Sequence, residues 1–194
     1  MNSGPSIAGS SRSPDSNDAT TSLAPASPPA FCKRIRAYRT FWFVAAVLFT
    51  LDQVTKVWIN NRLPLGTYGP PDAITVIDGF FNLVHVGNTG AAWSMFTGRS
   101  LLLACFALAA LAAIYFWRHT LSLKALPVQL SFGLLCGGIA GNLVDRIIHK
   151  HVIDFLDFHF GGYIYPTFNV ADSGICIGVA IYLIWSLRNP ESAR

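Results

Sequence analysis

The chain has 194 residues, of which 52% are hydrophobic and only 12% are charged. Soluble domains carry about 25% charged residues, so this composition excludes an ordinary soluble enzyme and a wholly disordered chain. The net charge of +4 fits a nucleic-acid binder or a membrane protein with basic ends, and the positions of the charges decide between them.

The first segment of the chain differs from the rest. Residues 1–30 are rich in Ser, Pro and Ala and have neither helical nor strand periodicity. A basic cluster of Lys33, Arg34, Arg36 and Arg39 follows. We therefore predict three regions: a disordered cytoplasmic tail with a basic border over 1–38, a transmembrane domain over 39–188, and a short cytoplasmic tail over 189–194.

Four apolar stretches are long enough to cross a bilayer as helices, which takes about 20 residues. They cover residues 40–60, 100–117, 125–144 and 173–187, and the fourth extends back to Phe168 if Asp172 is accepted inside the membrane. The predicted fold class is a membrane all-α protein, a four-transmembrane-helix bundle.

The basic residues orient this bundle. With four spans both ends of the chain share one side, and nine of the 14 Lys and Arg residues fall there. The positive-inside rule then places both termini in the cytoplasm. The same positions exclude nucleic acid as a partner, because the basic residues gather at membrane borders and form no continuous face.

The segment between the first two spans is more than a connector. Residues 73–86 are rich in β-branched and aromatic side chains, and Gly79 interrupts them. Such runs between turn signals are typical of strands. We predict a small extracytoplasmic β-rich segment between helices 1 and 2.

Glycines recur at four-residue spacing in the last two spans. The third span has Gly133, Gly137 and Gly141, and the fourth has Gly174 and Gly178. Small residues at this spacing let membrane helices approach closely, so tight helix packing is a sufficient explanation for them.

Charged residues inside the spans need a reason, because a charge at the bilayer centre costs roughly 2.5–3.5 kcal/mol on insertion scales. Asp52 and Lys56 are four residues apart on the first helix, so they can form a pair that supports the helix or belong to a site. Asn142, Asp145 and Arg146 share one face of the third helix, where they either cap its end or line a polar interior.

Asp154 and Asp172 are both expected at the outward boundary of the membrane, at similar depth. Two carboxylates there can share one proton, because like charges in contact cannot both ionise easily. Such a pair supplies a general base and a general acid together. Their separation of 18 residues leaves open whether they meet.

Two other chemistries have weaker signals. A metal could use the cluster of His149, His151, Asp154, Asp157 and His159, but the chain has neither an HExxH motif nor paired CxxC motifs. We therefore predict no metal and interpret the histidines as interfacial. Neither Ser94 nor Ser173 lies in a GxSxG nucleophile elbow.

Four blocks of sequence together resemble the lipoprotein signal peptidases, or signal peptidase II. They are LDQVTK at 51–56, NTGAAWS at 88–94, GGIAGNLVDR at 137–146 with VIDF at 152–155, and FNVAD at 168–172. The resemblance covers about residues 40–187. One departure is Gly87, where many members of that family have a basic residue.

The resemblance implies an aspartic endopeptidase of the bacterial inner membrane, with its active site at the periplasmic boundary. It would cut the signal peptide from diacylglyceryl-modified prolipoproteins just before the lipid-modified cysteine, without a cofactor. The matching catalytic residues are Asp154 and Asp172. The substrate-binding or site-supporting positions are Asp52, Lys56, Asn88, Asn142, Arg146 and Asn169.

The competing interpretation is a small membrane transporter or assembly subunit that uses its carboxylates as a proton relay. Transporters commonly contain internal repeats, but the two halves of this chain differ in loop length and motif. Agreement over four blocks favours the peptidase, with prolipoproteins and membrane lipids as partners.

Overall fold

The computed structural model describes residues 38–91, 95–118 and 120–190. The predicted tails therefore lie outside the described residues, apart from Tyr38, Asn189 and Pro190. The elements in chain order are α2 (Arg39–Arg62), β1 (Ile74–Ile77), β2 (Phe81–Asn88), α3 (Ser100–Trp117), α4 (Leu126–Ile148), β3 (Val152–Phe160), β4 (Tyr163–Ile164) and α5 (Val170–Arg188).

The four predicted spans are confirmed as helices. Within the described residues, α2, α3, α4 and α5 are long and apolar enough to cross a membrane. Two of them include charged turns that the predicted spans left out. Helix α4 continues to Ile148 and so includes Asp145 and Arg146, while α5 already begins at Val170 and has Asp172 in its first turn. A cation in a last turn and an anion in a first turn both stabilise a helix through its dipole.

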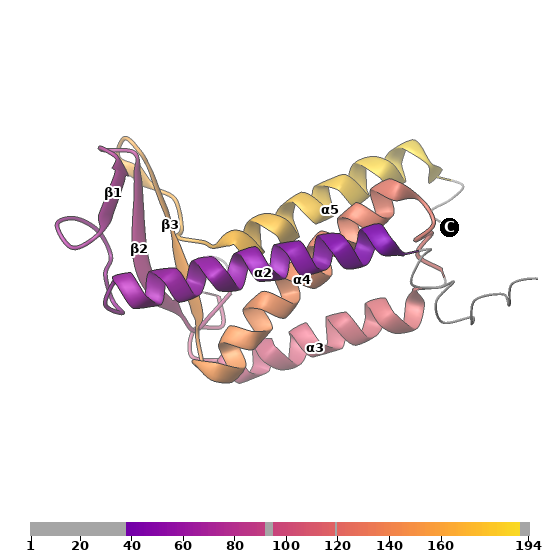
Figure 1. Ribbon diagram of the computed structural model, residues 1–194, viewed down its shortest axis with the longest axis horizontal. Coiled ribbons are helices and arrows are strands. Elements are labelled where there is room, and N and C mark those ends of the chain that lie inside the picture. Colours follow the sequence, from indigo (N-terminus) through magenta and orange to yellow (C-terminus); the bar gives the residue numbers. More distant parts are fainter. Residues whose placement is uncertain (1–37, 92–94, 119, 191–194) are drawn as a thin grey trace, which may run out of the picture.

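Helix α4 is the centre of the bundle and packs against α2, α3 and α5 (Figure 1). In the most apolar 18-residue stretch of α4, 56% of the helix is buried inside the protein, against 11% in α3. Glycines make this central position possible. A Cβ on Gly137 would lie 2.6 Å from the carbonyl oxygen of Ala45 in α2, and one on Gly138 would lie 2.5 Å from the carbonyl oxygen of Ala171 in α5. The predicted packing role of the glycine spacing is thereby confirmed.

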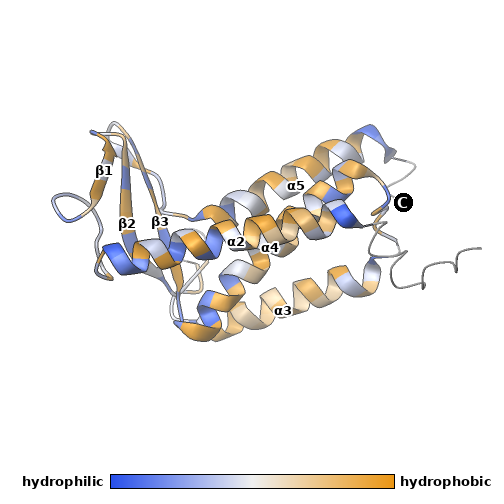
Figure 2. Ribbon diagram, viewed as in Figure 1, coloured by the Kyte–Doolittle hydropathy of each residue, from blue (hydrophilic) through white to orange (hydrophobic). Residues whose placement is uncertain are grey.

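The outward faces of the helices are strongly apolar (Figure 2). Large exposed side chains include Phe43, Leu101, Phe116 and Leu187. So many large exposed apolar side chains are rare on water-soluble monomers, and they suit contact with lipid chains.

A four-stranded antiparallel sheet, in the order β1-β2-β3-β4, lies at one end of the bundle (Figure 1). Strand β2 pairs with β3, and in their register Val86 faces Asp154 and Asn88 faces Val152. The sequence predicted only the first two strands, so the fold-class prediction was incomplete. Strands β3 and β4 come from the segment between α4 and α5, where Val152–Phe160 mixes apolar residues with Asp and His.

Candidate active site

Asp154 lies near the start of β3, where the sheet meets the helices. The preceding residue is held in place because Ile153 N donates a hydrogen bond to Asp145 Oδ2 at 3.1 Å. The Asp154 side chain itself is only 2% exposed. Its position is therefore set by the last turn of α4 as well as by the pairing of β3 with β2.

Asp172 is fixed by the way α5 begins. Asn169 is the N-cap of this helix, and its Oδ1 accepts a hydrogen bond from Asp172 N at 2.9 Å. In return, Asp172 Oδ2 accepts a hydrogen bond from Asn169 N at 3.2 Å. This reciprocal pair is a capping box, which satisfies two helix-end N–H groups and locks the Asp172 side chain.

The same asparagine joins the two aspartates. Asn169 is fully buried, and its Nδ2 donates to Asp154 Oδ1 at 2.7 Å. Since Asn169 also caps the helix that contains Asp172, a single side chain bridges the strand and the helix that provide the two carboxylates. The sequence left open whether Asp154 and Asp172 meet. In the structure the Asn169 side chain contacts both residues, Asp154 at its carboxylate and Asp172 at its backbone N–H.

The remaining carboxylate oxygens are also occupied by amide donors. Asn88 Nδ2 donates to Asp154 Oδ2 at 2.9 Å, and Asn142 Nδ2 donates to Asp172 Oδ1 at 2.8 Å. Every carboxylate oxygen of the pair therefore accepts one N–H group, and each keeps a second lone pair for water or a proton. Both carboxyl groups are oriented before any substrate is present.

The environment of Asp154 changes its acidity. Burial in a poorly solvated site, with the negative charge of Asp172 as the next contribution, raises the pKa of Asp154 to about 7. Hydrogen bonds from Asn88 and Asn169 favour the ionised form and oppose this shift. Asp154 can consequently hold a proton near neutral pH, which an ordinary aspartate cannot.

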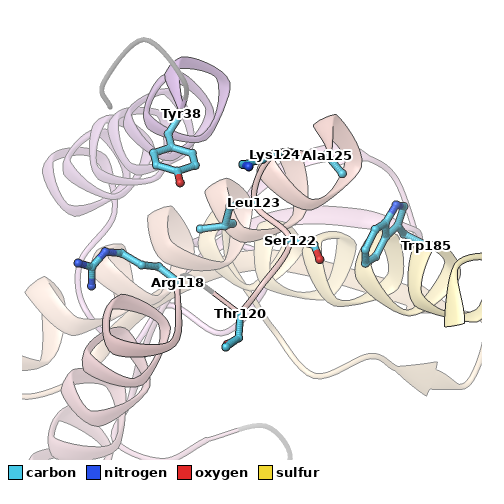
Figure 3. A pocket seen from close by; sticks show the side chains of 8 residues that line it. All are labelled: Tyr38, Arg118, Thr120, Ser122, Leu123, Lys124, Ala125 and Trp185. Carbon is cyan, nitrogen blue, oxygen red and sulfur yellow. The ribbon is translucent and has the colours of Figure 1, made fainter. Parts of the chain in front are cut away.

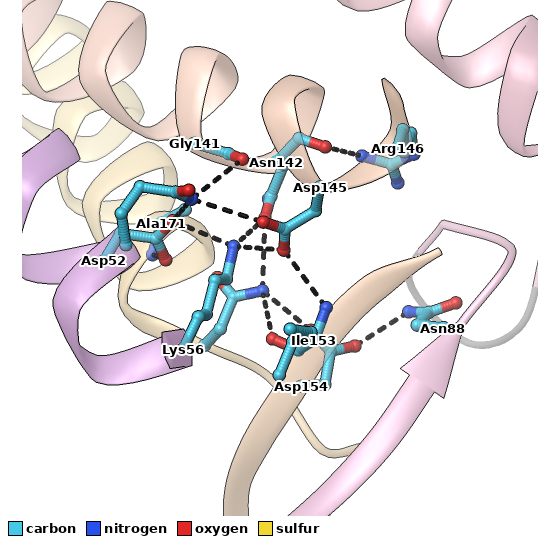
Figure 4. Close-up of polar contacts among 12 residues, drawn as sticks. Asp52, Lys56, Asn88, Gly141, Asn142, Asp145, Arg146, Ile153, Asp154 and Ala171 are labelled. Atoms are coloured by element: carbon cyan, nitrogen blue, oxygen red, sulfur yellow. Dashed lines mark hydrogen bonds and ion pairs between the residues drawn. The ribbon is translucent and has the colours of Figure 1, made fainter. Parts of the chain in front are cut away.

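A second polar cluster lies beside Asp154, around Lys56 (Figure 4). The Lys56 ammonium is 2.8 Å from Asp52 Oδ2, 2.8 Å from Asp145 Oδ2 and 2.9 Å from Asn142 Oδ1. These contacts use all three N–H donors of the ammonium. Lys56 therefore positions its neighbours and has no donor left for a ligand.

The contact with Lys56 determines which way the Asn142 amide faces. Because an ammonium can only donate, the Asn142 oxygen must point to Lys56 and the NH₂ group must point to Asp172. Asn142 Oδ1 also accepts from Asn169 Nδ2 at 3.2 Å. The buried cation thus orients the aspartate pair through a single amide.

Asp52 ties the helices together at this level. Its Oδ1 accepts a hydrogen bond from Ala171 N at 3.0 Å, so α2 helps to cap the N-terminus of α5. A Cβ on Gly141 of α4 would collide with the Asp52 carboxylate, so only glycine leaves room for it. The sequence allowed either a helix-supporting Asp52–Lys56 pair or a role at a site. The structure shows the pair, and it shows that both residues contact the polar network around the aspartates.

Arg146 connects the helix end to the loop after β2. Its guanidinium donates to the carbonyl oxygens of Asn142 at 3.2 Å and Gly90 at 3.0 Å. Its Nε is buried and has no hydrogen-bond partner among the described residues. The motif block at 88–94 ends in residues 92–94, which lie outside the described part of the chain.

All eight predicted site residues lie in this one network. Two further members were not chosen as site residues from the sequence. The sequence marks Asp145 only as a charged residue on the shared helix face, and Gln53 is not among the predicted site residues. Gln53 Nε2 donates to Asp52 Oδ2 at 3.1 Å and Asp145 Oδ1 at 3.2 Å. The sequence does contain a signal for Asp145, because a carboxylate at the end of a membrane span predicts a partner cation nearby.

Two other sequence features have structural explanations. The imidazole of His151 packs against Gly87, where an added Cβ would lie 3.0 Å from His151 Cδ2, so a larger residue there would displace the ring. His159 Nε2 lies 2.7 Å from Asp157 Oδ2. Among the described residues, no three metal-ligating side chains converge on a common point.

Comparison with known proteins assigns the chain to a family. A sequence profile described as signal peptidase (SPase) II matches residues 44–188. The chain belongs to the signal peptidase II family. It is 46% identical over 142 residues to the lipoprotein signal peptidase of Oleidesulfovibrio alaskensis, covering 71% of this chain and 87% of that one. With the enzyme of Bacillus pumilus it shares 39% identity over 79% of this chain and 96% of the relative.

The fold is similar to that of a solved structure as well. A protein described as a bacterial membrane enzyme, determined by the in meso method, superposes with a TM-score of 0.70 at 31% identity. The match covers 80% of this chain and 92% of that structure. This signal peptidase II family member is therefore a peptidase and a multi-pass membrane protein, which sets the transporter and assembly-subunit interpretations aside.

We expect Lys56→Met to destabilise the protein strongly. The change leaves Asp52 and Asp145 buried without their cation, and breaking a buried ion pair costs about 3–5 kcal/mol. This loss corresponds to a drop of about 10 °C in the thermal unfolding midpoint, measured on the purified protein in detergent.

The matched control is Arg62→Met, which removes an exposed cation from the end of the same helix. Adding Asp52→Asn and Asp145→Asn to Lys56→Met should recover part of the lost stability, because no unpaired charge then remains. Equal midpoints for Lys56→Met and Arg62→Met would contradict the role assigned to Lys56.

Proposed function

We propose that this protein is an intramembrane aspartic endopeptidase that removes the signal peptide from diacylglyceryl-modified prolipoproteins, cutting just before the lipid-modified cysteine. Membership of the signal peptidase II family and relatives named lipoprotein signal peptidase support the substrate class. The observation that carries the mechanism is the Asn169 amide, which bridges the carboxyl group of Asp154 and the helix start that bears Asp172.

The two aspartates divide the acid and base roles. Asp154 is the more buried, and its raised pKa of about 7 makes it the member that holds the proton. Asp172, which is partly exposed, takes a proton from the attacking water. Asp154 donates its proton to the carbonyl oxygen of the scissile bond, which stabilises the tetrahedral intermediate. When the intermediate collapses, the C–N bond breaks, the proton on Asp172 passes to the leaving amine, and Asp154 takes back a proton from a hydroxyl of the intermediate, so both carboxyl groups return to their starting states.

The surrounding polar residues act on this pair. Asn88, Asn142 and Asn169 hold the carboxyl groups in fixed orientations through the amide hydrogen bonds described above. Asp52 and Lys56 are positioning residues, since their contacts are with Asn142 and the start of α5. Arg146, with its unpartnered Nε, binds a carbonyl of the substrate beside the scissile bond.

The position of the pair suits a substrate that is itself anchored in the membrane. Asp172 lies in the first turn of a membrane helix, and Asp154 lies in the strand that packs over the same end of the bundle. A signal peptide can remain in the bilayer while its scissile bond reaches this boundary. The chemistry uses water and two carboxyl groups, so it requires no metal or other cofactor.

The remaining assignments follow from the charge distribution. We place the protein in the bacterial inner membrane with both termini cytoplasmic and the sheet on the periplasmic side. The support is the sequence, in which nine of the 14 Lys and Arg residues fall before the first span, between the second and third spans, or after the fourth. The proposed peptidase domain covers residues 39–188, between a cytoplasmic tail at 1–38 and another at 189–194.

We expect Asp154→Asn and Asp172→Asn each to lower the cleavage rate of a diacylglyceryl-modified prolipoprotein by at least about 10²-fold. Asparagine keeps the shape of the side chain but cannot hold or transfer the proton. Cleavage is measured with purified protein in lipid, and the folding of each variant is checked by its thermal unfolding midpoint.

Asp157→Asn is the control, because Asp157 is a buried carboxylate on the same strand that pairs with His159 and lies outside the Asn169 network. It should retain most of the rate. If either Asp154→Asn or Asp172→Asn folds normally and cleaves at near wild-type rates, that carboxyl group is not part of the catalytic pair.

The pH profile tests the role of Asp154 as the acid. The proton on Asp154 is lost as pH rises through its pKa of about 7, so kcat/KM should fall on the alkaline side near that pH. The hydrogen bond from Asn88 lowers the pKa of Asp154. Asn88→Ala removes this bond, which raises the pKa and should shift the alkaline limb to higher pH even if the maximal rate is reduced.

Asn82→Ala is the matched control for this measurement. Asn82 lies on the same strand as Asn88 and donates to the carboxylate of Asp157 instead. In Asn82→Ala, kcat/KM should fall on the alkaline side at the same pH as in the wild type. If the alkaline fall in kcat/KM moves to lower pH in Asn88→Ala, the acid role belongs to another group.

A further inference from the structure

A cavity of about 490 Å³ is lined by the loop between α3 and α4 (Figure 3), at the end of the bundle opposite the sheet (Figure 1). It is formed where the loop between α3 and α4 packs between the start of α2 and the end of α5. Tyr38 and Arg118 line it on one side of this loop, and Trp185 lines it on the other (Figure 3). Its volume falls within the range of about 300–1,000 Å³ that is typical of small-ligand sites.

The cavity has a positive electrostatic environment. Arg118 and Lys124 line it, and Arg39 and Arg188 lie at the same end of the bundle. Among the described residues, the carboxylates belong to the polar network, to the sheet or to the loop and turn beside the sheet. An anion is the ligand that such a site attracts.

The start of α4 adds partial positive charge at the same place. Ala125, which lines the cavity, is the N-cap of α4 and provides no side-chain cap. The first turn contains no acidic residue. Pro127 in this turn has no N–H to donate, so the helix start favours a bound anion mainly through its dipole.

The cavity is a built feature, because its floor is part of a packed core. Leu123, which lines it, is 8% exposed and packs with Val128 and Phe132 in one apolar cluster. Tyr38 and Trp185 pack against the same cluster from α2 and α5. The guanidinium of Arg118 is held by Tyr115 of α3: it lies 4.2 Å from the centroid of that ring and donates to the Tyr115 carbonyl oxygen. These contacts fix the lining groups in place.

We propose that this cavity binds the phosphate group of an anionic phospholipid headgroup. Arg118 and Lys124 line the cavity beside the start of α4 and supply positive charge for the phosphate, while Tyr38 and Trp185 contact the glycerol region with rings that prefer the membrane interface. The apolar helix faces beside the cavity leave the acyl chains in the bilayer. The site is distinct from the peptidase site and lies at the other end of the same helices.

The test measures lipid binding by the full-length protein in detergent. Native mass spectrometry compares retention of phosphatidylglycerol with that of phosphatidylcholine, which is zwitterionic. Arg118→Gln with Lys124→Gln should weaken phosphatidylglycerol binding by at least about tenfold, given the usual contribution of each basic residue to anionic lipid binding. Phosphatidylcholine binding should change by less than about twofold, because it lacks the net negative charge.

The matched control is Arg39→Gln with Arg188→Gln, which removes two cations from the same end without touching the cavity lining. Equal losses in both double variants would overturn the proposal in favour of general attraction between charges. Inorganic phosphate is tested separately by calorimetry. If it binds with an affinity equal to that of phosphatidylglycerol and depends on Arg118 and Lys124, the ligand is a soluble phosphate and the lipid proposal is wrong.

Discussion

The structure depends on the requirement that a charge buried among membrane helices must be fully paired. The Lys56 ammonium meets it with two carboxylates and one amide oxygen, and these groups come from α2 and α4. Each partner then extends the network to another element. Asp52 caps the start of α5, Asp145 holds the strand before Asp154, and Asn142 turns its NH₂ group toward Asp172. One buried cation therefore organises every segment that contributes to the aspartate pair.

This arrangement joins helix capping to the proposed chemistry. The Asn169 side chain has two roles. Its oxygen caps the N-terminus of α5, and its Nδ2 donates a hydrogen bond to Asp154. The fold of α5 and the orientation of both carboxyl groups are consequently parts of one hydrogen-bonded unit. Preorganisation of this kind reduces the rearrangement required when charge develops in a transition state. The close approach of α4 to its neighbours, which its glycines permit, brings these groups within hydrogen-bond distance.

Much of this could be predicted from the sequence, because membrane spans have a strong and local signal. The four helices were found from charge-free runs, and the site residues were found from four motif blocks in their order. Strands β3 and β4 were missed, since Val152–Phe160 forms a strand through its pairing with β2, which is remote in sequence. Asp145 and Gln53 were missed as site members for a related reason. Their role depends on which side chains surround Lys56, and spacing along one helix does not reveal partners on another.

The central claim is that the aspartate pair holds a proton on Asp154 near neutral pH. Infrared spectroscopy tests it directly, through the C=O stretch that only a protonated carboxyl group shows. The difference spectrum between wild type and Asp154→Asn is recorded in lipid from about pH 5 to about pH 9. The account predicts a protonated carboxyl band that is absent from the variant and disappears as pH rises through about 7. A difference spectrum without such a band below pH 7 would show that Asp154 is ionised throughout, and would contradict the account.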